Sequence, residues 1–231
     1  SRFRATGERR LLRDAMRRAD VLVAVSEFTA ERIHALSGRD AVVTPLAPAP
    51  WATPPSPGQV AEVRARYGLP DRFVLQVGTV EPRKSVALVA EACRNLDVPF
   101  VLAGAGSTGR DAPSGAHGLG YVATADLPAL YAAASVVAYA SRYEGFGLPP
   151  LEAMACGGAV VSSAVGALPD FADDGALLVT EHTVPAWTAA LRATLLDLDT
   201  AQALRRRAPE VASTLTWTRT AELTVGAYRT A

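Results

Sequence analysis

Features that would point to common classes of partner are scarce in this sequence. Its 231 residues include 23 basic and 23 acidic side chains, so the formal net charge at pH 7 is zero. Domains that bind nucleic acid usually carry a basic excess, and this chain carries none. We therefore expect no nucleic-acid partner.

Cysteine and histidine are equally sparse. Cys93 and Cys156 form no CxxC or Cys/His pattern, which disfavours a metal site. Two free thiols in a large domain suit a reducing compartment. His34, His117 and His182 lack the spacing of a ligand set or a catalytic triad, and we interpret them as surface residues.

Long apolar runs are missing as well. The longest weakly apolar stretch, residues 153–168, contains Gly and Ser and is too short to span a bilayer. At the start of the sequence, no positively charged region leads into an apolar stretch, so no signal peptide is visible. We expect a cytoplasmic protein, with peripheral attachment to a membrane as a second expectation.

Short apolar runs, by contrast, recur along the chain. Apolar residues make up 49% of the sequence and aromatic residues 6%, so the core should consist of Ala, Val and Leu. Segments with the apolar spacing of a helix lie between most of the runs. One such segment contains Val86, Val89, Ala90 and Cys93, and another extends from Trp187 to Leu198. This alternation predicts a doubly wound, Rossmann-like parallel sheet that binds ligands beyond the carboxyl ends of its strands. The expected strands are residues 73–77, 98–104, 118–122, 135–140, 159–163 and 176–179.

Residues 1–46 read as helix, strand, helix and strand, with Ser26 as the expected N-cap of the second helix. Four elements cannot bury both faces of a sheet, so we interpret them as the last elements of an N-terminal Rossmann-like domain. A proline-rich linker and a lead-in helix should follow at 47–70. We place a ligand-binding domain at 71–212 and a helix at 213–231 that packs back toward the N-terminal domain.

Three loops follow expected strands and could meet at one crevice. In "VGTVEPRKS", Gly78 permits close approach of a ligand, and Arg83 and Lys84 open a helix, which suits a phosphate. A solvated Arg–Lys pair is the alternative. The Gly-rich "AGAGSTG" of residues 103–109 does not open a helix, and we interpret it as a plain loop.

The third loop, "SRYEGFGLPPLEAMA", places Glu144 before a helix that Pro149 or Pro150 begins. Glu152 then falls in the first helical turn, and the amides of Phe146, Gly147 and Leu148 could form an anion nest. Alternatively, Glu152 only stabilises the helix dipole and Glu144 is exposed. Spacing alone leaves both interpretations open.

Together these motifs resemble the retaining glycosyltransferases of family GT4, whose GT-B fold consists of two facing Rossmann-like domains. The resemblance covers essentially the whole chain and is strongest to the donor-binding C-terminal half of bacterial mannosyl- and rhamnosyltransferases. It rests on "VGTVEPRKSVALVAEA", "LGYVATADLPALYAAASVV", "SRYEGFGLPPLEAMACGGAVVSS" and "VGALPDFADDGALLV". Where many relatives carry Arg after the first glycine, this chain has Thr79, so one phosphate contact would be weaker or come from Arg83.

The resemblance also implies roles for single residues. Lys84 and Glu144 would be catalytic, Lys84 by neutralising the departing diphosphate and Glu144 by placing the donor sugar. Glu152 would bind the ribose hydroxyls, and no metal or other cofactor would be needed. The remaining donor-binding positions are Gly78, Thr79 and Arg83 in the phosphate loop, Tyr121 and Val122 at the base, and the amides of Gly145, Phe146, Gly147 and Leu148.

The activity expected from the resemblance is transfer of a sugar, with retention, from a nucleotide-diphosphate donor to an unknown glycan, lipid or small-molecule acceptor. GDP-mannose is the first expectation for the donor and a UDP-sugar the second. Members of this family are about twice the size of one Rossmann domain. We therefore expect a missing N-terminal domain or a partner chain to supply the acceptor site. Two alternatives remain: a nucleotide-sugar-binding module without catalysis, and an enzyme resembling nucleotide-sugar epimerases.

Overall fold

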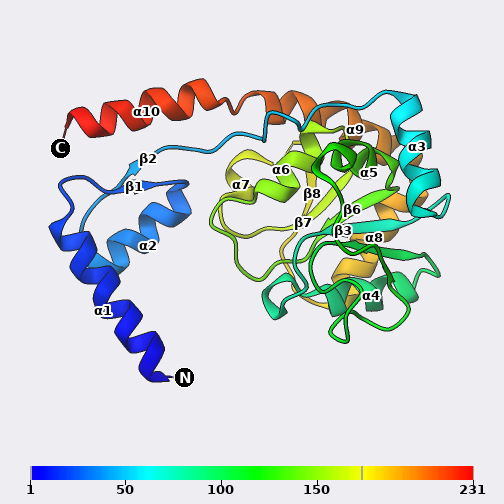
Figure 1. Ribbon diagram of the computed structural model, residues 1–231, viewed down its shortest axis with the longest axis horizontal. Coiled ribbons are helices and arrows are strands. Elements are labelled where there is room, and N and C mark those ends of the chain that lie inside the picture. The colour runs from blue at the N-terminus through cyan, green and yellow to red at the C-terminus, as the bar shows by residue number, and fades with distance from the viewer. Residues whose placement is uncertain (1, 173, 231) are drawn as a thin grey trace. The chain divides into compact units, whose positions relative to one another are not determined.

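The computed structural model describes residues 2–172 and 174–230, and the chain divides into two compact units (Figure 1). The larger unit is Pro48–Thr214. The smaller unit combines the residues up to Ala47 with those from Leu215 onward.

The larger unit contains one parallel sheet of six strands in the order β5-β4-β3-β6-β7-β8. This is the doubly wound order, in which the chain reverses direction across the sheet between β3 and β6. The prediction of a doubly wound parallel sheet is confirmed, and five strands fall within the predicted apolar runs. The strand expected at 118–122 was wrong: β5 overlaps it only at Gly118, and Gly120, with φ 68°, interrupts the extended backbone. The strands are β3 (Val74–Val77), β4 (Phe100–Ala103), β5 (His117–Gly118), β6 (Val136–Tyr139), β7 (Val160–Ser163) and β8 (Ala176–Val179).

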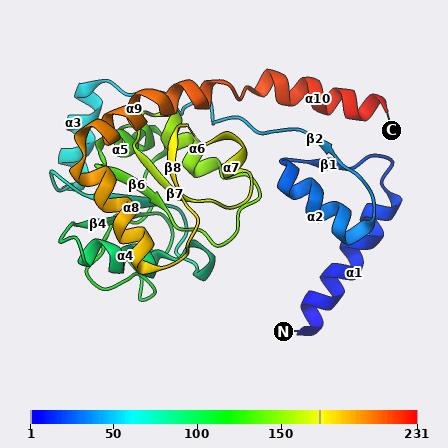
Figure 2. The ribbon, with the colours of Figure 1, turned by 180° about the vertical axis from the view of Figure 1, so that it is seen from behind.

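Helices cover both faces of this sheet (Figures 1 and 2). On one face α4 (Val86–Arg94) packs against α8 (Val184–Leu196). On the other face lie α5 and α6, with α3 against α5 and α9 against α6. The bounds are α3 (Pro57–Tyr67), α5 (Leu127–Ala133), α6 (Leu148–Ala155) and α9 (Leu198–Ser213), with the short α7 (Leu168–Phe171), η1 (Pro82–Lys84) and η2 (Thr124–Asp126) in the connections.

Because both faces are covered, the central strands are buried on both sides and read as continuous apolar runs. Val74, Leu75, Val137 and Ala138 are fully buried. Most core side chains are Ala, Val or Leu, as the composition predicts. The large exceptions include Trp187, which α8 inserts into the core.

The helix expected to run through Leu198 instead ends at Leu196, and a second helix begins at Leu198. Asp197 between them is the N-cap of α9: its carboxylate accepts hydrogen bonds from the N–H groups of Asp199 (3.0 Å) and Thr200 (3.3 Å). Leu198 is consequently 71% exposed. The prediction was wrong in its last turn because apolar periodicity does not report a capping carboxylate.

The smaller unit contains a two-stranded parallel sheet and three helices among its described residues. Ser26 caps the second helix as predicted, since its Oγ accepts a hydrogen bond from the N–H of Thr29 at 3.1 Å. The last helix belongs to this unit, and its Thr220 Oγ1 donates to the carbonyl of Pro45 at 2.5 Å. The elements are α1 (Arg2–Arg18), β1 (Val23–Ala24), α2 (Glu27–Ser37), β2 (Val42–Val43) and α10 (Trp217–Arg229).

One arginine of α9 connects several segments of the larger unit. The Arg205 guanidinium donates hydrogen bonds to the carbonyls of Ala132 (3.3 Å), Ala134 (2.5 Å), Ser135 (3.3 Å) and Gly157 (3.2 Å). Three of these carbonyls lie at the C-terminal end of α5, where helix carbonyls lack partners and the dipole is negative. Arg205 therefore satisfies groups that the α5 backbone cannot satisfy itself.

We predict that Arg205→Ala lowers the free energy of unfolding by about 2–4 kcal/mol, because four carbonyls lose a charged donor. Urea denaturation of the wild type and the variant measures the change. Arg206→Ala is the matched control, since Arg206 is the next residue on the same helix and is exposed. The control should stay within about 0.5 kcal/mol of the wild type. Equal losses in the two variants would contradict the role given to Arg205.

Candidate functional site

The candidate site lies where β3 and β6 end, at the reversal point of the sheet. After β3 the chain passes through η1 to α4 on one face, and after β6 it passes to α6 on the other. Two loops that leave neighbouring strands for opposite faces diverge, which is why open α/β sheets bind ligands at this place. The two loops, residues 78–85 and 140–147, are the first and third loops singled out in the sequence.

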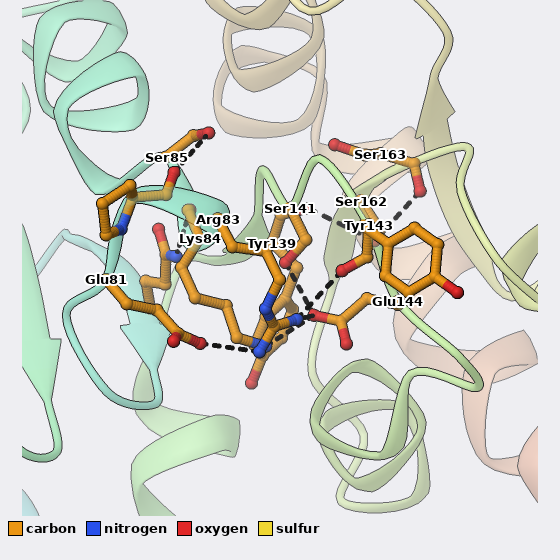
Figure 3. A network of polar contacts seen from close by, with 12 residues as sticks. Glu81, Arg83, Lys84, Ser85, Tyr139, Ser141, Tyr143, Glu144, Ser162 and Ser163 are labelled. Carbon is orange, nitrogen blue, oxygen red and sulfur yellow. Dashed lines mark hydrogen bonds and ion pairs between the residues drawn. The ribbon is translucent and has the colours of Figure 1, made fainter. Parts of the chain in front are cut away.

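The side chains of these two loops meet at one carboxylate oxygen (Figure 3). Glu144 Oε1 lies 2.5 Å from Lys84 Nζ and 3.0 Å from the Arg83 guanidinium, and it accepts a hydrogen bond from Ser141 Oγ at 2.8 Å. The side chains of Lys84 and Glu144 are only 9% and 13% exposed. Glu144 Oε2 accepts no hydrogen bond from another described residue, so it remains open to a ligand hydroxyl.

These contacts fix the charge of Glu144. Burial alone raises the pKa of this carboxyl. Hydrogen bonds from Lys84 and Ser141, with the charges of Lys84 and Arg83, outweigh burial and lower the pKa below its usual value. Glu144 is therefore ionised at neutral pH and acts as an acceptor, not as an acid.

Backbone contacts hold the two loops in place around the ion pair. Gln76 Nε2 in β3 donates to the carbonyl of Lys84 at 3.0 Å, and the N–H of Arg142 donates to the carbonyl of Arg83 at 2.9 Å. The Arg83 guanidinium also donates to the carbonyl of Tyr143 at 2.9 Å. The cluster is thus positioned before any ligand arrives.

Two expectations about the first loop were wrong. Arg83 and Lys84 do not open a helix but form η1, and α4 begins at Val86. The solvated alternative fails for Lys84, which is buried. Ser85 stands between the two helices in the left-handed region, with φ 46°.

His182, expected at the surface, is half-buried with Nε2 2.9 Å from Ser85 Oγ. Burial, and then the charge of Arg142, lowers the pKa of its ring. Sequence reasoning missed this contact and that of Ser141. For the contact between Ser141 and Glu144, the only signal in the sequence is that both residues lie in the same turn.

A cavity of about 300 Å³ opens beside the first loop. Gly104 has φ 124°, and a Cβ there would lie 2.5 Å from the carbonyl oxygen of Gly78, so only glycine lets these loops approach. The backbone N–H and C=O of Val122 make no hydrogen bond with another described residue. The Gly-rich loop of residues 103–109, which we interpreted as a plain loop, contributes Ala103, Gly104 and Ala105 to the wall of the cavity. The lining residues are Val77, Gly78, Thr79, Ala103, Gly104, Ala105, Tyr121, Val122, Thr124 and Leu127.

The loop that follows Glu144 contains the three N–H groups that we expect to form an anion nest. Among the described residues, the N–H groups of Phe146, Gly147 and Leu148 find no acceptor. Gly147 is the N-cap of α6 with φ 104°, and Gly145 lies in the same turn. Free N–H groups at a helix start suit a phosphate or sugar oxygen.

Glu152 stands apart from this cluster. It is the fifth residue of α6, so the expectation that it lies in the first turn was wrong. Its half-buried carboxyl forms no hydrogen bond or ion pair with a described residue, Lys84 and Glu144 included. Burial without donors raises its pKa to about 7.

The described residues offer few other sites for chemistry. No three His, Cys, Asp or Glu side chains among them lie close enough together to hold a metal ion. No described helix is both long enough and apolar enough to cross a membrane. Cys93 and Cys156 are buried free thiols, and burial raises the pKa of each to about 12.

We predict that Glu152 makes the free energy of unfolding fall as pH rises from about 4.5 to about 7, the ordinary and folded-state pKa values of this carboxyl. Over that range the folded state keeps a proton that the unfolded state has lost. Glu152→Gln should flatten this part of the pH profile in urea unfolding. Glu91→Gln, which removes an exposed charge on α4, should keep the wild-type slope. An unchanged profile in Glu152→Gln would refute the assignment.

Comparisons with known proteins agree with this architecture. The profile of the family described as "Glycosyl transferases group 1" matches residues 61–211. The chain is 32% identical to O-antigen chain mannosyltransferase B of Escherichia coli, over 94% of this chain and 62% of that protein. It is 36% identical to D-inositol 3-phosphate glycosyltransferase of Kineococcus radiotolerans, over 92% of this chain and 58% of that protein. The chain thus spans about three fifths of the length of these relatives.

Solved structures show the same fold. Sucrose-phosphate synthase from Thermosynechococcus elongatus superposes with a TM-score of 0.79 at 24% identity, over 99% of this chain and 61% of that one. Anabaena HepE in complex with UDP-glucose superposes with a TM-score of 0.82 at 21% identity, over 94% of this chain and 67% of that one. Both are glycosyltransferases of the GT-B fold. With a family profile that covers most of its length, this chain belongs to the group 1 glycosyl transferases.

Proposed function

We propose that this chain binds a nucleotide-diphosphate sugar between the β3 and β6 loops and forms the donor site of a retaining glycosyltransferase of family GT4. The observation that carries the proposal is the Lys84–Glu144 pair at the reversal point of the sheet, with one carboxylate oxygen left open. Because the chain spans about three fifths of its relatives, we propose that it binds the donor without transferring the sugar by itself.

In this proposal the diphosphate lies against Lys84, Arg83 and the N–H groups of residues 146–148. An ammonium group has three donors, so Lys84 can keep its contact with Glu144 and still donate to phosphate oxygens. As the bond to the sugar breaks, negative charge grows on the diphosphate. A cation already fixed at that place stabilises the charge without rearranging, and no metal is needed for that task.

Glu144 would hold the donor sugar. Its Oε1 is occupied by Lys84 and Ser141, whereas Oε2 can accept a hydrogen bond from a sugar hydroxyl. Because the carboxyl stays ionised, it can orient that hydroxyl as an acceptor throughout the reaction. This contact places the anomeric carbon relative to the leaving group.

The base and ribose would lie on the other side of the diphosphate. The cavity beside Gly78 and Thr79 offers the base an apolar wall together with the free backbone groups of Val122. Two ribose hydroxyls could supply the donors that the Glu152 carboxyl lacks. GDP-mannose remains our first proposal for the donor, which the similarity to a mannosyltransferase supports, and a UDP-sugar is the second.

We predict that GDP raises the melting temperature more than UDP, ADP or CDP at equal concentration. A ligand that binds only the folded state stabilises it by mass action, so the order of shifts reports the order of affinities. GMP serves as the control for the diphosphate contacts and should give a smaller shift than GDP. A larger shift with UDP would select the second donor, and equal shifts with every nucleotide would refute a base site in the cavity.

We predict that wild-type protein binds GDP about 10- to 100-fold more tightly than 2′,3′-dideoxy-GDP, because hydrogen bonds to a charged group contribute about 1.5–3 kcal/mol. Glu152→Ala should bind both nucleotides with the weaker affinity. Calorimetry on the two proteins and two ligands measures the coupling, and exposed Glu91→Ala should retain the preference. Unchanged GDP affinity in Glu152→Ala would refute the ribose role.

A further inference from the structure

We propose that Gly166 is a positioning residue for Glu144, and that residues 164–171, which follow β7, support the loop that holds the donor sugar. The functional part of this inference rests on the sugar-binding role proposed for Glu144. Gly166 itself need not touch the donor. Its effect would pass through the backbone of Glu144.

The contact between Gly166 and Glu144 is too close for any other residue type. Gly166 has φ 62°, and a Cβ built on it would lie 2.2 Å from the carbonyl oxygen of Glu144 and 2.9 Å from its carbonyl carbon. Contacts under 3.0 Å are essentially never made by real Cβ atoms. Because both obstructing atoms are backbone, a side chain at this position has to displace the loop.

Two further contacts join the same pair of segments. A Cβ on Gly147 would lie 3.1 Å from the Leu168 side chain, and the rings of Phe146 and Phe171 stack with centroids 5.1 Å apart. The supporting segment is itself tied to the sheet, since the N–H of Ala164 donates to the carbonyl of Val179 in β8 at 2.9 Å. The sugar-binding loop thus rests on a segment anchored by neighbouring strands.

A shift of this loop would affect one half of the donor site more than the other. Glu144 Oε1 has contacts of 2.5 Å with Lys84 and 2.8 Å with Ser141, which a displaced backbone would lengthen. The proposed base cavity is lined by residues of other loops, and Glu152 lies on α6. The same shift would also disturb the N–H groups of residues 146–148, to which we assign the diphosphate. Loss of Gly166 should therefore weaken binding of the sugar nucleotide more than binding of the nucleotide alone.

The test compares Gly166→Ala with Gly157→Ala by calorimetry. Gly157 has φ 77°, and no atom lies within 4 Å of its built Cβ, so its variant adds similar backbone strain without displacing a neighbour. The ligands are GDP and GDP-mannose, or the nucleotide and sugar nucleotide that the melting series selects. Gly166→Ala should lose about 10-fold more affinity for the sugar nucleotide than for the nucleotide. Both affinities of Gly157→Ala should change less than about twofold.

A double variant shows whether Gly166 acts through Glu144. If it does, adding Gly166→Ala to Glu144→Ala should lower the affinity for the sugar nucleotide no more than the affinity for the nucleotide. Phe171→Ala, which withdraws support from Phe146 instead of adding an atom, is the second variant should Gly166→Ala fail to fold. It should show the same selective loss. Equal loss for both ligands, or a loss no greater than that of Gly157→Ala, would overturn the inference.

Carbon-detected NMR titration of Glu144 gives a readout that does not depend on the donor. Gly166→Ala should raise the pKa of Glu144, because its hydrogen bonds from Lys84 and Ser141 lengthen, whereas Gly157→Ala should not. If Glu144→Ala leaves sugar-nucleotide affinity unchanged while this pKa still rises in Gly166→Ala, the proposed sugar role is wrong and the positioning role stands. An unchanged pKa in Gly166→Ala overturns the positioning role.

Discussion

The ion pair between Lys84 and Glu144 is the interaction on which the arrangement of the site depends. It joins two loops that leave neighbouring strands for opposite faces of the sheet, and both partners are largely withdrawn from water. Removing one partner of such a pair leaves an uncompensated charge in a poorly solvated place, which is strongly unfavourable. The pair therefore keeps the crevice in one geometry, and Ser141 and Arg83 complete the shell around the same oxygen.

The two glutamates of the site differ in what surrounds them. Glu144 is saturated with donors at one oxygen and has its pKa lowered, whereas Glu152 has no donor and has its pKa raised to about 7. Around Glu144, only Oε2 lacks a hydrogen-bond donor when no ligand is bound. The surroundings of Glu152 favour the ionised carboxylate only when a ligand supplies hydrogen-bond donors. The two glutamates belong to one sequence motif, yet their surroundings suit two different physical roles.

The sequence predicted those parts of the structure that depend on local pattern. Continuous apolar runs located five of the six strands because both faces of the sheet are covered, and the glycine and proline signals located the loops at their carboxyl ends. The exception is the edge strand β5, which is only two residues long. It could not predict the break at Asp197, since Leu198 continues the apolar repeat while the carboxylate caps the next helix. It also could not predict that His182 reaches Ser85 or that Gly166 lies against Glu144. Those contacts join residues distant along the chain, and no local spacing encodes them.

The isolated carboxyl of Glu152 has a consequence for the chemistry of binding. With a pKa of about 7, it carries a proton in about half of the molecules at neutral pH. Two hydroxyl donors from a bound ribose would favour the ionised form, so association would expel that proton into solution. Affinity for the nucleotide would then be linked to the acidity of the medium, and a mildly acidic environment would weaken the hold on the donor without altering a single contact to the diphosphate.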